Sequence, residues 1–106
     1  MTGAEFRKLA LSFSGAIEKE HMGHPDFRAG ERGKIFASLG FEEDWGMVKL
    51  TPERQAEYIE KDPEAFRPAA GAWGLGGSTI VTLAKGKKAL VKKALSEAWE
   101  NVSSKK

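Results

Sequence analysis

Nine residues in the second half of the chain, AGAWGLGGS at 70–78, have glycines spaced almost as in a nucleotide-binding phosphate loop. The pattern here is G-x-x-x-x-G-G-S. A phosphate loop instead carries lysine before its Ser or Thr and opens a helix whose N-terminus faces the anion. Gly77 occupies the lysine position, and a β-branched run rather than a helix starts at Ser78. The glycines therefore predict a connection that needs positive φ angles or close backbone approach, and no nucleotide loop.

Trp73 lies among these glycines. An exposed tryptophan can stack on a nucleobase. Tryptophan more often anchors itself, buried or half-buried, against a core. The sequence favours an anchored Trp73 and leaves base stacking open.

Side chains that commonly bind metals or perform catalysis are few. The only histidines, His21 and His24, are spaced i, i+3 across a glycine-containing turn. The acids close to them are Glu18, Glu20 and Asp26. Residues three apart in a strand point to opposite faces, so ordinary surface histidines are expected rather than a metal site. The acidic run 42–44 is interpreted as a solvated loop, and no serine stands in a G-x-S-x-G pattern. We therefore expect no catalytic residue, no metal and no cofactor.

Positive charge is concentrated towards the C-terminal end. The net charge is only +2, but residues 85–106 hold seven lysines against two glutamates, a local charge of +5 that leaves −3 on the rest. Lys85, Lys87 and Lys88 lie at the start of an expected helix, where their charge opposes the helix dipole unless an anion binds there. Two interpretations stay open: an electrostatic footprint for a polyanion, or a solvated lysine-rich helix.

Hydrophobic periodicity and turn residues predict an α+β fold. Thr2 to Glu5 form a capping box, and Thr51-Pro52 is a typical helix start. Short runs between residues 17 and 50, separated by glycine-containing turns, are typical of an antiparallel meander. The expected helices are 3–12, 51–61 and 87–101, and the expected strands are 17–22, 26–29, 34–39, 45–50, 66–68 and 78–84. This order predicts two layers, with about three helices covering one face of an antiparallel β-sheet.

A chain of 106 residues with 41% hydrophobic content suits a single domain with a modest core. We expect that domain to cover 1–102, followed by a frayed tail at 103–106. The absence of cysteine excludes disulfides and thiolate chemistry and favours the cytoplasm. The first residues lack a signal-peptide pattern, and no window is apolar enough to span a membrane. No membrane association is expected, and a monomer is favoured.

Several segments, taken in order, resemble the MmcQ/YjbR family. They are LALSFSG, GHPDFRAGERGKIFASL, VKLTPERQAEYIEKDPEAFRPA and WGLGGSTIVTL, and the resemblance covers residues 4–100. One departure is Phe13-Ser14-Gly15, where the family usually has Leu-Pro-Gly. The resemblance implies a secretion-chaperone-like, double-wing domain in a bacterial cytoplasm, with an inferred role in DNA binding and no catalytic residues.

The family's recurrent positions map onto both core and cationic residues of this chain. They are Phe27, Gly33, Lys34, Phe36, Lys49, Leu50, Phe66, Pro68, Trp73 and Gly74. Core packing accounts for the apolar members but not for Lys34 and Lys49. Each of these lysines precedes an apolar strand residue, so we expect both to point from an open sheet face towards an anion.

Three functions follow as hypotheses. The first is DNA binding through phosphate contacts and stacking, by Arg28, Lys34, Lys49, Arg67, Trp73, Lys85, Lys87, Lys88 and Lys92. The second is a protein-binding adaptor that uses the sheet or the helices, which requires an exposed apolar patch. The third is a small-anion binder with a concave site beside Lys34 and Lys49, closed by the loop from Gly71 to Ser78.

Overall fold

The computed structural model describes residues 1–40 and 42–103 and has an α+β fold. Six strands form one antiparallel sheet in the order β1-β2-β3-β4-β6-β5. The strands are β1 Ile17–His21, β2 His24–Arg28, β3 Ile35–Leu39, β4 Trp45–Lys49, β5 Phe66–Pro68 and β6 Ser78–Thr82. The helices are α1 Gly3–Leu11, α2 Pro52–Lys61, α3 Gly71–Leu75 and α4 Lys88–Ser103.

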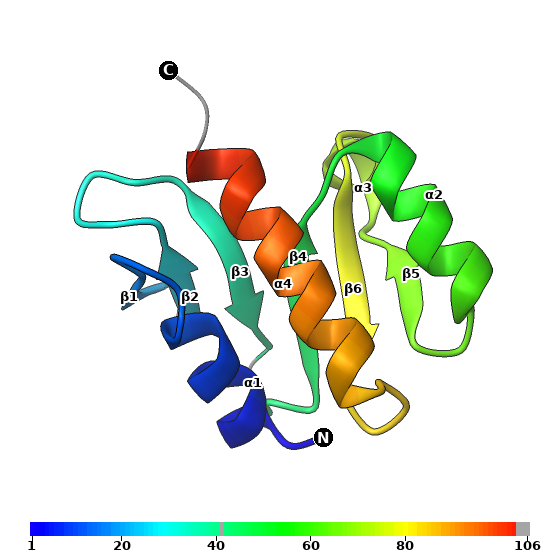
Figure 1. Cartoon of the computed structure of the whole chain (residues 1–106), viewed down its shortest axis with the longest axis horizontal. Coiled ribbons are helices and arrows are strands. Elements are labelled where there is room, and N and C mark those ends of the chain that lie inside the picture. Colours follow the sequence, from blue (N-terminus) through cyan, green and yellow to red (C-terminus); the bar gives the residue numbers. More distant parts are fainter. Residues whose placement is uncertain (41, 104–106) are drawn as a thin grey trace.

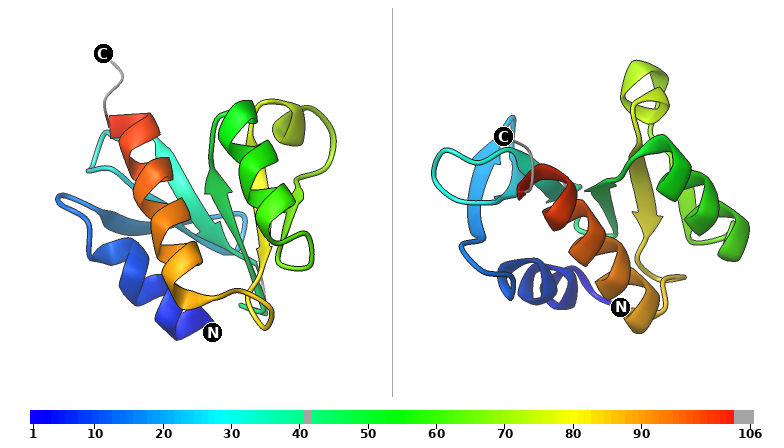
Figure 2. Two further views of the ribbon diagram at one scale, coloured as in Figure 1. Left: turned by 45° about the vertical axis from the view of Figure 1, so that its right-hand side comes forward. Right: turned by 45° about the horizontal axis from the view of Figure 1, so that its top comes forward.

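Three of these helices form one layer over the sheet. In Figure 1, α1, α4 and α2 lie side by side in front of the strands, with α4 crossing the middle. Helix α4 packs against β3, β4 and α1, whereas α2 packs against β5 and β6. The short α3 stands apart from this layer in the right-hand view of Figure 2. The predicted two-layer architecture is confirmed.

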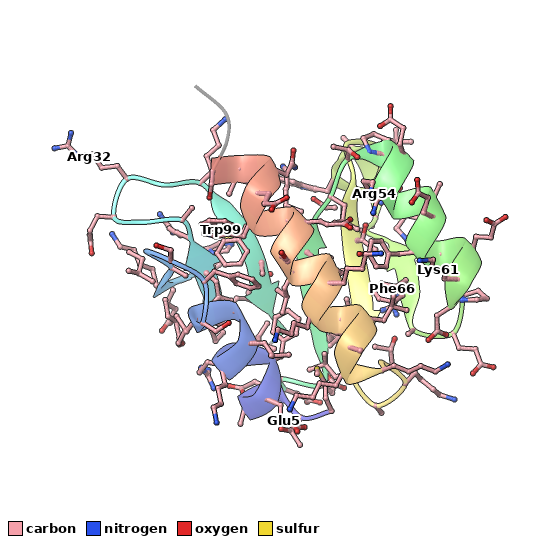
Figure 3. The ribbon with its side chains drawn as sticks, viewed as in Figure 1. Glu5, Arg32, Arg54, Lys61, Phe66 and Trp99 are labelled. Atoms are coloured by element: carbon pink, nitrogen blue, oxygen red, sulfur yellow. The ribbon has the colours of Figure 1, made fainter. Side chains whose placement is uncertain are left out.

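The core lies between the helices and the sheet. Phe6 of α1, Phe27 of β2, Val48 of β4 and Leu95 of α4 are all fully buried. Phe6 lies edge-on to Phe27, with ring centroids 6.2 Å apart. Arg54 reaches from α2 towards α4 above this core (Figure 3), where its guanidinium pairs with Glu97. Burial of these side chains supplies the main driving force for folding.

Strand β3 contains an irregularity that matters for the open face. Phe27 pairs with Ala37 and the next residue, Arg28, pairs with Ile35, so Phe36 is an extra residue in β3. A bulge of this kind shifts the alternation of side chains along a strand. Ile35 therefore shares a face with Ser38, although three positions separate them, while Phe36 is buried in the core beside Phe13.

The glycine-rich connection has the geometry that was predicted, with one addition. Gly71 and Gly77 have φ angles of 65° and 112°. A side chain at Gly77 would collide with the carbonyl oxygen of Leu50, and one at Gly74 with that of Ala69. Both predicted needs, positive φ and close backbone approach, are confirmed. The prediction of a plain connection was incomplete, because residues 71–75 form helix α3 between β5 and β6.

The other expected elements are present, with small differences at their ends. Helix α4 begins at Lys88 and runs to Ser103, whereas a helix over 87–101 was expected, and α4 includes the first residue of the predicted tail. The rest of the predicted tail, 104–106, lies outside the described residues. Among the helices of the described chain, none is both long and apolar enough to cross a membrane.

Candidate binding site on the open face of the sheet

The sheet face opposite α1, α2 and α4 carries a row of mostly polar side chains. Cross-strand partners point to the same face, and the register places six residues, one from each strand, in one row. They are Lys19, Asp26, Ser38, Met47, Ile80 and Arg67. A second row beside it contains Lys49 and its partner Ser78. These rows form the surface that the helix layer leaves uncovered.

A hollow of about 220 Å³ lies on this face, under the indole of Trp73. This hollow is here called the Trp73 groove. The residues that line it are His21, Ile35, Ser38, Met47, Lys49, Trp73 and Ser78. Strands β1, β3, β4 and β6 supply six of them and α3 supplies the indole. A concave site thus adjoins Lys49, which the small-anion hypothesis required. It includes Trp73 and Ser78 from the connection that was expected to close it.

Lys49 and Trp73 meet at the rim of the groove. The Lys49 ammonium Nζ lies 5.6 Å from the centroid of the Trp73 ring, within the range of a cation–π contact. Trp73 is 71% exposed, so the preference for an anchored tryptophan was wrong. The physical reason is that α3 projects from the sheet, which leaves the indole touching the rim instead of the core.

Ser78 is the least solvated polar group of the groove. It is 2% exposed, and its hydroxyl Oγ is buried without a hydrogen-bond partner among the described residues. The backbone carbonyl of Ser78, in contrast, accepts hydrogen bonds from the Gln55 side chain and from the Ala69 amide. A buried hydroxyl without a partner costs free energy. The sheet therefore holds Ser78 in place through its backbone and leaves the hydroxyl available.

Beside the groove, the buried carboxylate of Asp26 contacts the side chains of both His21 and Arg28. Asp26 is fully buried; Arg28 Nε donates to its Oδ1 at 2.9 Å, and His21 Nδ1 lies 2.6 Å from its Oδ2. Burial acts to raise the pKa of Asp26, but the hydrogen bonds from Arg28 and His21 outweigh it and hold that pKa below its ordinary value. Arg28 was predicted to contact phosphate, yet its guanidinium is already paired with Asp26.

The remaining predicted residues of the sheet region are not part of the groove. Arg67 is exposed on the open face and donates to the Thr82 hydroxyl at 2.9 Å. Lys34 is exposed but precedes β3, and its neighbour Ile35 lines the groove instead. Of the two lysines that were expected to act together from one face, Lys49 lines the groove and Lys34 does not, and a binding role of either stays a prediction. The bulge at Phe36 is the reason for this difference between the two lysines, because it sets which side chains of β3 face the groove.

The lysines near the start of α4 lie on the other side of the molecule. Lys88 and Lys92 line a separate hollow of about 270 Å³ between α4 and α1, together with Glu5 and Lys8. Lys87 is exposed at the start of α4, and Lys85 lies 4.0 Å from Glu64, a weak exposed pair. Of the predicted contact residues, Lys88 and Lys92 thus lie at a different hollow from the one that Lys49 and Trp73 line.

Sequence reasoning missed the members of the groove that carry little charge. Ser78 was taken as the start of a strand and as the end of the loop expected to close the site, with no role for its hydroxyl, and Ile35 and Met47 were taken as apolar strand residues. Alternation along each strand predicts that Lys49 points to the same face as Met47, and that Ser78 points to the same face as Ile80. The pairing of Lys49 with Ser78 depends on register, which the sequence does not state.

The two histidines have separate partners. Their ring centroids are 6.3 Å apart, and His24 Nδ1 lies 3.2 Å from the Leu39 carbonyl oxygen while His21 contacts Asp26. Within the residues described here, no group of three or more His, Cys, Asp or Glu side chains is placed to hold a metal ion.

Comparison with known proteins agrees with this architecture. The chain is similar in structure to the Deinococcus radiodurans protein DR2400, a protein with a DUF419 domain, with a TM-score of 0.84 at 19% sequence identity. The alignment covers 98% of this chain and 80% of that one, which shows a shared fold. No curated protein matches the chain. The model of the YjbR family matches residues 11–101, and the protein therefore belongs to the YjbR family.

Proposed function

We propose that this domain is a non-enzymatic nucleic-acid-binding module that holds single-stranded DNA on the open face of its sheet. The observation that carries the proposal is the pairing of an exposed indole, Trp73, with the Lys49 ammonium at the rim of a groove. Proteins that bind single strands combine aromatic side chains, which stack on bases, with cations that contact the phosphates. Trp73 would stack on one base, and Lys49 and Arg67 would contact neighbouring phosphates.

A single strand fits the charge distribution better than a duplex. A dedicated duplex binder presents a basic stripe or patch on one face. Among the described strand residues, Lys49 and Arg67 are cations of the open face, and Lys19 and Arg28 on the same face are already paired with Glu31 and Asp26, whereas Lys88 and Lys92 lie between α4 and α1. A strand that contacts only two phosphates needs a stacking platform to gain affinity, and Trp73 supplies one.

The adaptor hypothesis finds less support. Large apolar side chains that are exposed within the described chain lie on separate segments: Leu11 on α1, Met22 in the β1–β2 turn, and Trp73 and Leu75 on α3. A protein-docking surface of the adaptor type needs a contiguous apolar patch of several hundred Å². Of these four side chains, Trp73 and Leu75 share a helix, and Trp73 already contacts Lys49.

The test is a fluorescence-anisotropy titration of a labelled oligothymidine of about eight nucleotides. Known single-strand-binding domains cover roughly 4–16 nucleotides, so this length suits a small domain. With two phosphate contacts, log K against log salt should have a slope of about −1.4. Replacing Trp73→Ala should weaken binding by about 1–3 kcal/mol. Leu75→Ala is the matched control, because Leu75 is equally exposed on α3 but does not line the Trp73 groove.

Two results would refute the proposal. One is the absence of binding at low salt. The other is an equal loss of affinity in the Trp73→Ala and Leu75→Ala variants, which would assign the effect to α3 as a whole. A salt slope several times steeper than expected, lost in a Lys88→Met/Lys92→Met variant, would move the interface to the helix side.

A further inference from the structure

We infer that the Trp73 groove is a binding site for a small planar organic anion, meaning one ring that carries a single carboxylate or phosphate group. This goes beyond the nucleic-acid proposal, because the site would bind a free small molecule whether or not a DNA strand binds the same face. Four features of the groove support it: a hydroxyl without a partner, an available ammonium, an apolar floor and a limited volume.

The hydroxyl is that of Ser78. At 2% exposure and without a partner among the described residues, it is a donor for which the fold supplies no acceptor. Native proteins rarely leave such groups unsatisfied, and each instance calls for an explanation such as an absent ligand or ion. An oxygen of a bound anion would accept this hydrogen bond.

The ammonium is that of Lys49, which lies directly across the β4–β6 pair from Ser78. Cross-strand partners hold their side chains on the same face, so both donors border one small volume. Among the described residues, no carboxylate forms an ion pair with Lys49, and its recorded contact is the Trp73 ring. An oxyanion between Lys49 and Ser78 would gain a charge-assisted hydrogen bond.

The carboxylate of Asp26, beside the groove, does not repel an anion bound at Lys49 and Ser78. Asp26 lies in the same region of the open face, but Arg28 and His21 both contact its carboxylate. The Arg28 guanidinium balances the negative charge of Asp26. The Lys49 ammonium therefore remains the charge that the anion would meet.

The floor and the volume of the groove select a flat, small ligand. Ile35 and Met47 provide an apolar base, and the Trp73 indole provides a surface for stacking. A volume of about 220 Å³ is below the roughly 300–1,000 Å³ of sites for drug-sized ligands. One ring with its anionic group is the largest ligand that this volume accepts with most of its surface buried.

Contact with Ser78 requires the rim to open, because the hydroxyl is covered in the unliganded chain. Trp73 is the side chain that can move, since it is 71% exposed and sits on the five-residue helix α3. Binding should therefore change the environment of the Trp73 indole. This gives a readout at the ligand-contacting residue itself.

The experiment is an NMR titration of the full chain, following backbone amides and the Trp73 indole N–H, with four probes. Benzoate and phenyl phosphate carry both ring and anion, inorganic phosphate carries only the anion, and benzamide carries only the ring. We expect saturable shifts at Ser78, Met47 and Trp73 with benzoate, phenyl phosphate or both. The stronger of the two identifies the anionic group. Inorganic phosphate and benzamide should bind at least tenfold more weakly.

Two variants separate a ligand contact from a structural role. Ser78→Ala removes an unsatisfied hydroxyl, so its denaturation midpoint should be unchanged or higher, while ring-anion affinity falls about tenfold or more, as for a hydrogen bond to a charged group. Lys49→Met should lower that affinity at least as much. Ser96→Ala, half-buried on α4, is the matched control and should leave affinity unchanged.

Three outcomes would overturn the inference. They are no saturable shift with either ring anion, equal binding of benzamide and benzoate, and undiminished affinity in Ser78→Ala. Failure here is distinguishable from failure of the nucleic-acid proposal. Oligothymidine binding with no ring-anion binding would leave that proposal standing, and ring-anion binding without oligothymidine binding would leave only the small-ligand site.

Discussion

The two faces of the sheet are made by the same strands but differ in what their side chains contact. On the covered face, Phe27, Val48 and Val81 are fully buried against the helices. On the open face, Asp26 has its ion-pair partner, whereas the Lys49 ammonium contacts an aromatic ring and forms no ion pair among the described residues, and the Ser78 hydroxyl has no hydrogen-bond partner there. Tyr58 and Trp99 of the helix layer also have a buried polar atom without a partner, but neither lines the Trp73 groove. The comparison teaches that the open face, unlike the covered one, brings such a group together with a cation at a hollow of the surface.

The helix side has an ion-pair cluster that contrasts with the groove. Arg54 of α2 pairs with both Glu57 and Glu97 and so joins α2 to α4. Burial acts to raise the pKa of Glu97, but the hydrogen bond from Arg54 outweighs it and lowers that pKa. This cluster is complete within the chain, and its charges hold two helices together. Lys49 performs no such task.

The largest effect should come from the covered face. Phe36→Ala removes a fully buried ring that lies edge-on to Phe13, and we expect the free energy of unfolding to fall by about 3–5 kcal/mol. Urea denaturation followed by circular dichroism measures it. A loss below about 1 kcal/mol would mean that the bulge residue is not part of the core.

The next effect should come from the satisfied part of the open face. Asp26→Asn keeps the shape but removes the charge that Arg28 and His21 contact, and we expect a loss of about 1.5–3 kcal/mol of unfolding free energy. The same denaturation assay checks it, with Glu31→Gln, which pairs with Lys19 through a largely exposed side chain, as the control. Equal small losses in both variants would show that the Asp26 cluster is no stronger than a surface pair.

Acid should reveal the same cluster. The pKa values of Asp26 and Glu97 are lowered in the folded chain, so both carboxylates stabilise the fold above their unfolded pKa values of about 4. That stabilisation is lost as the pH falls through the lower folded values. The thermal midpoint should drop below pH 4, and it should drop less in Asp26→Asn. Parallel pH curves for wild type and variant would contradict the assignment.

The smallest effect on stability should come from the rim of the groove. Trp73→Ala removes one of the largest side chains of the molecule, yet that side chain is mostly exposed, and we expect the unfolding free energy to change by no more than about 0.5 kcal/mol. The same substitution is expected to weaken ligand binding. A stability loss comparable to that of Phe36→Ala would instead show that Trp73 anchors the fold. That result would contradict the assignment of Trp73 to ligand binding.

Much of the fold was predictable because its signals are local. The capping box at Thr2 and Glu5 forms in the structure, and Thr51 caps α2 as its sequence indicates. Alternation and glycine turns located the meander within a residue or two. The helix in residues 71–75 was missed because three of its five residues are a tryptophan and two glycines, which carry no helical periodicity.

The candidate site was only partly predictable. Lys49 and Trp73 were selected through a family resemblance and an unusual sequence context, and the structure brings them together. Lys34 was selected through the same resemblance as Lys49 but does not line the groove. Lys85, Lys87, Lys88 and Lys92 were selected by charge, and charge alone does not state which face a side chain occupies. Arg28 was selected in the same way, although its partner Asp26 stands two residues away on the same strand face.

Apart from α3, the sequence by itself determined the elements and their order, together with core residues such as Phe27 and Phe36, since caps, turns and periodicity act over a few neighbouring positions. Only the tertiary structure decided which polar groups share a surface and which remain without partners. The register between β4 and β6 sets Lys49 opposite Ser78, the bulge at Phe36 turns Ile35 towards them, and α3 carries Trp73 to their rim. The register, the bulge and the position of α3 each depend on contacts between segments that are distant in the sequence. The free energy of packing selects these features, and local conformational preference does not.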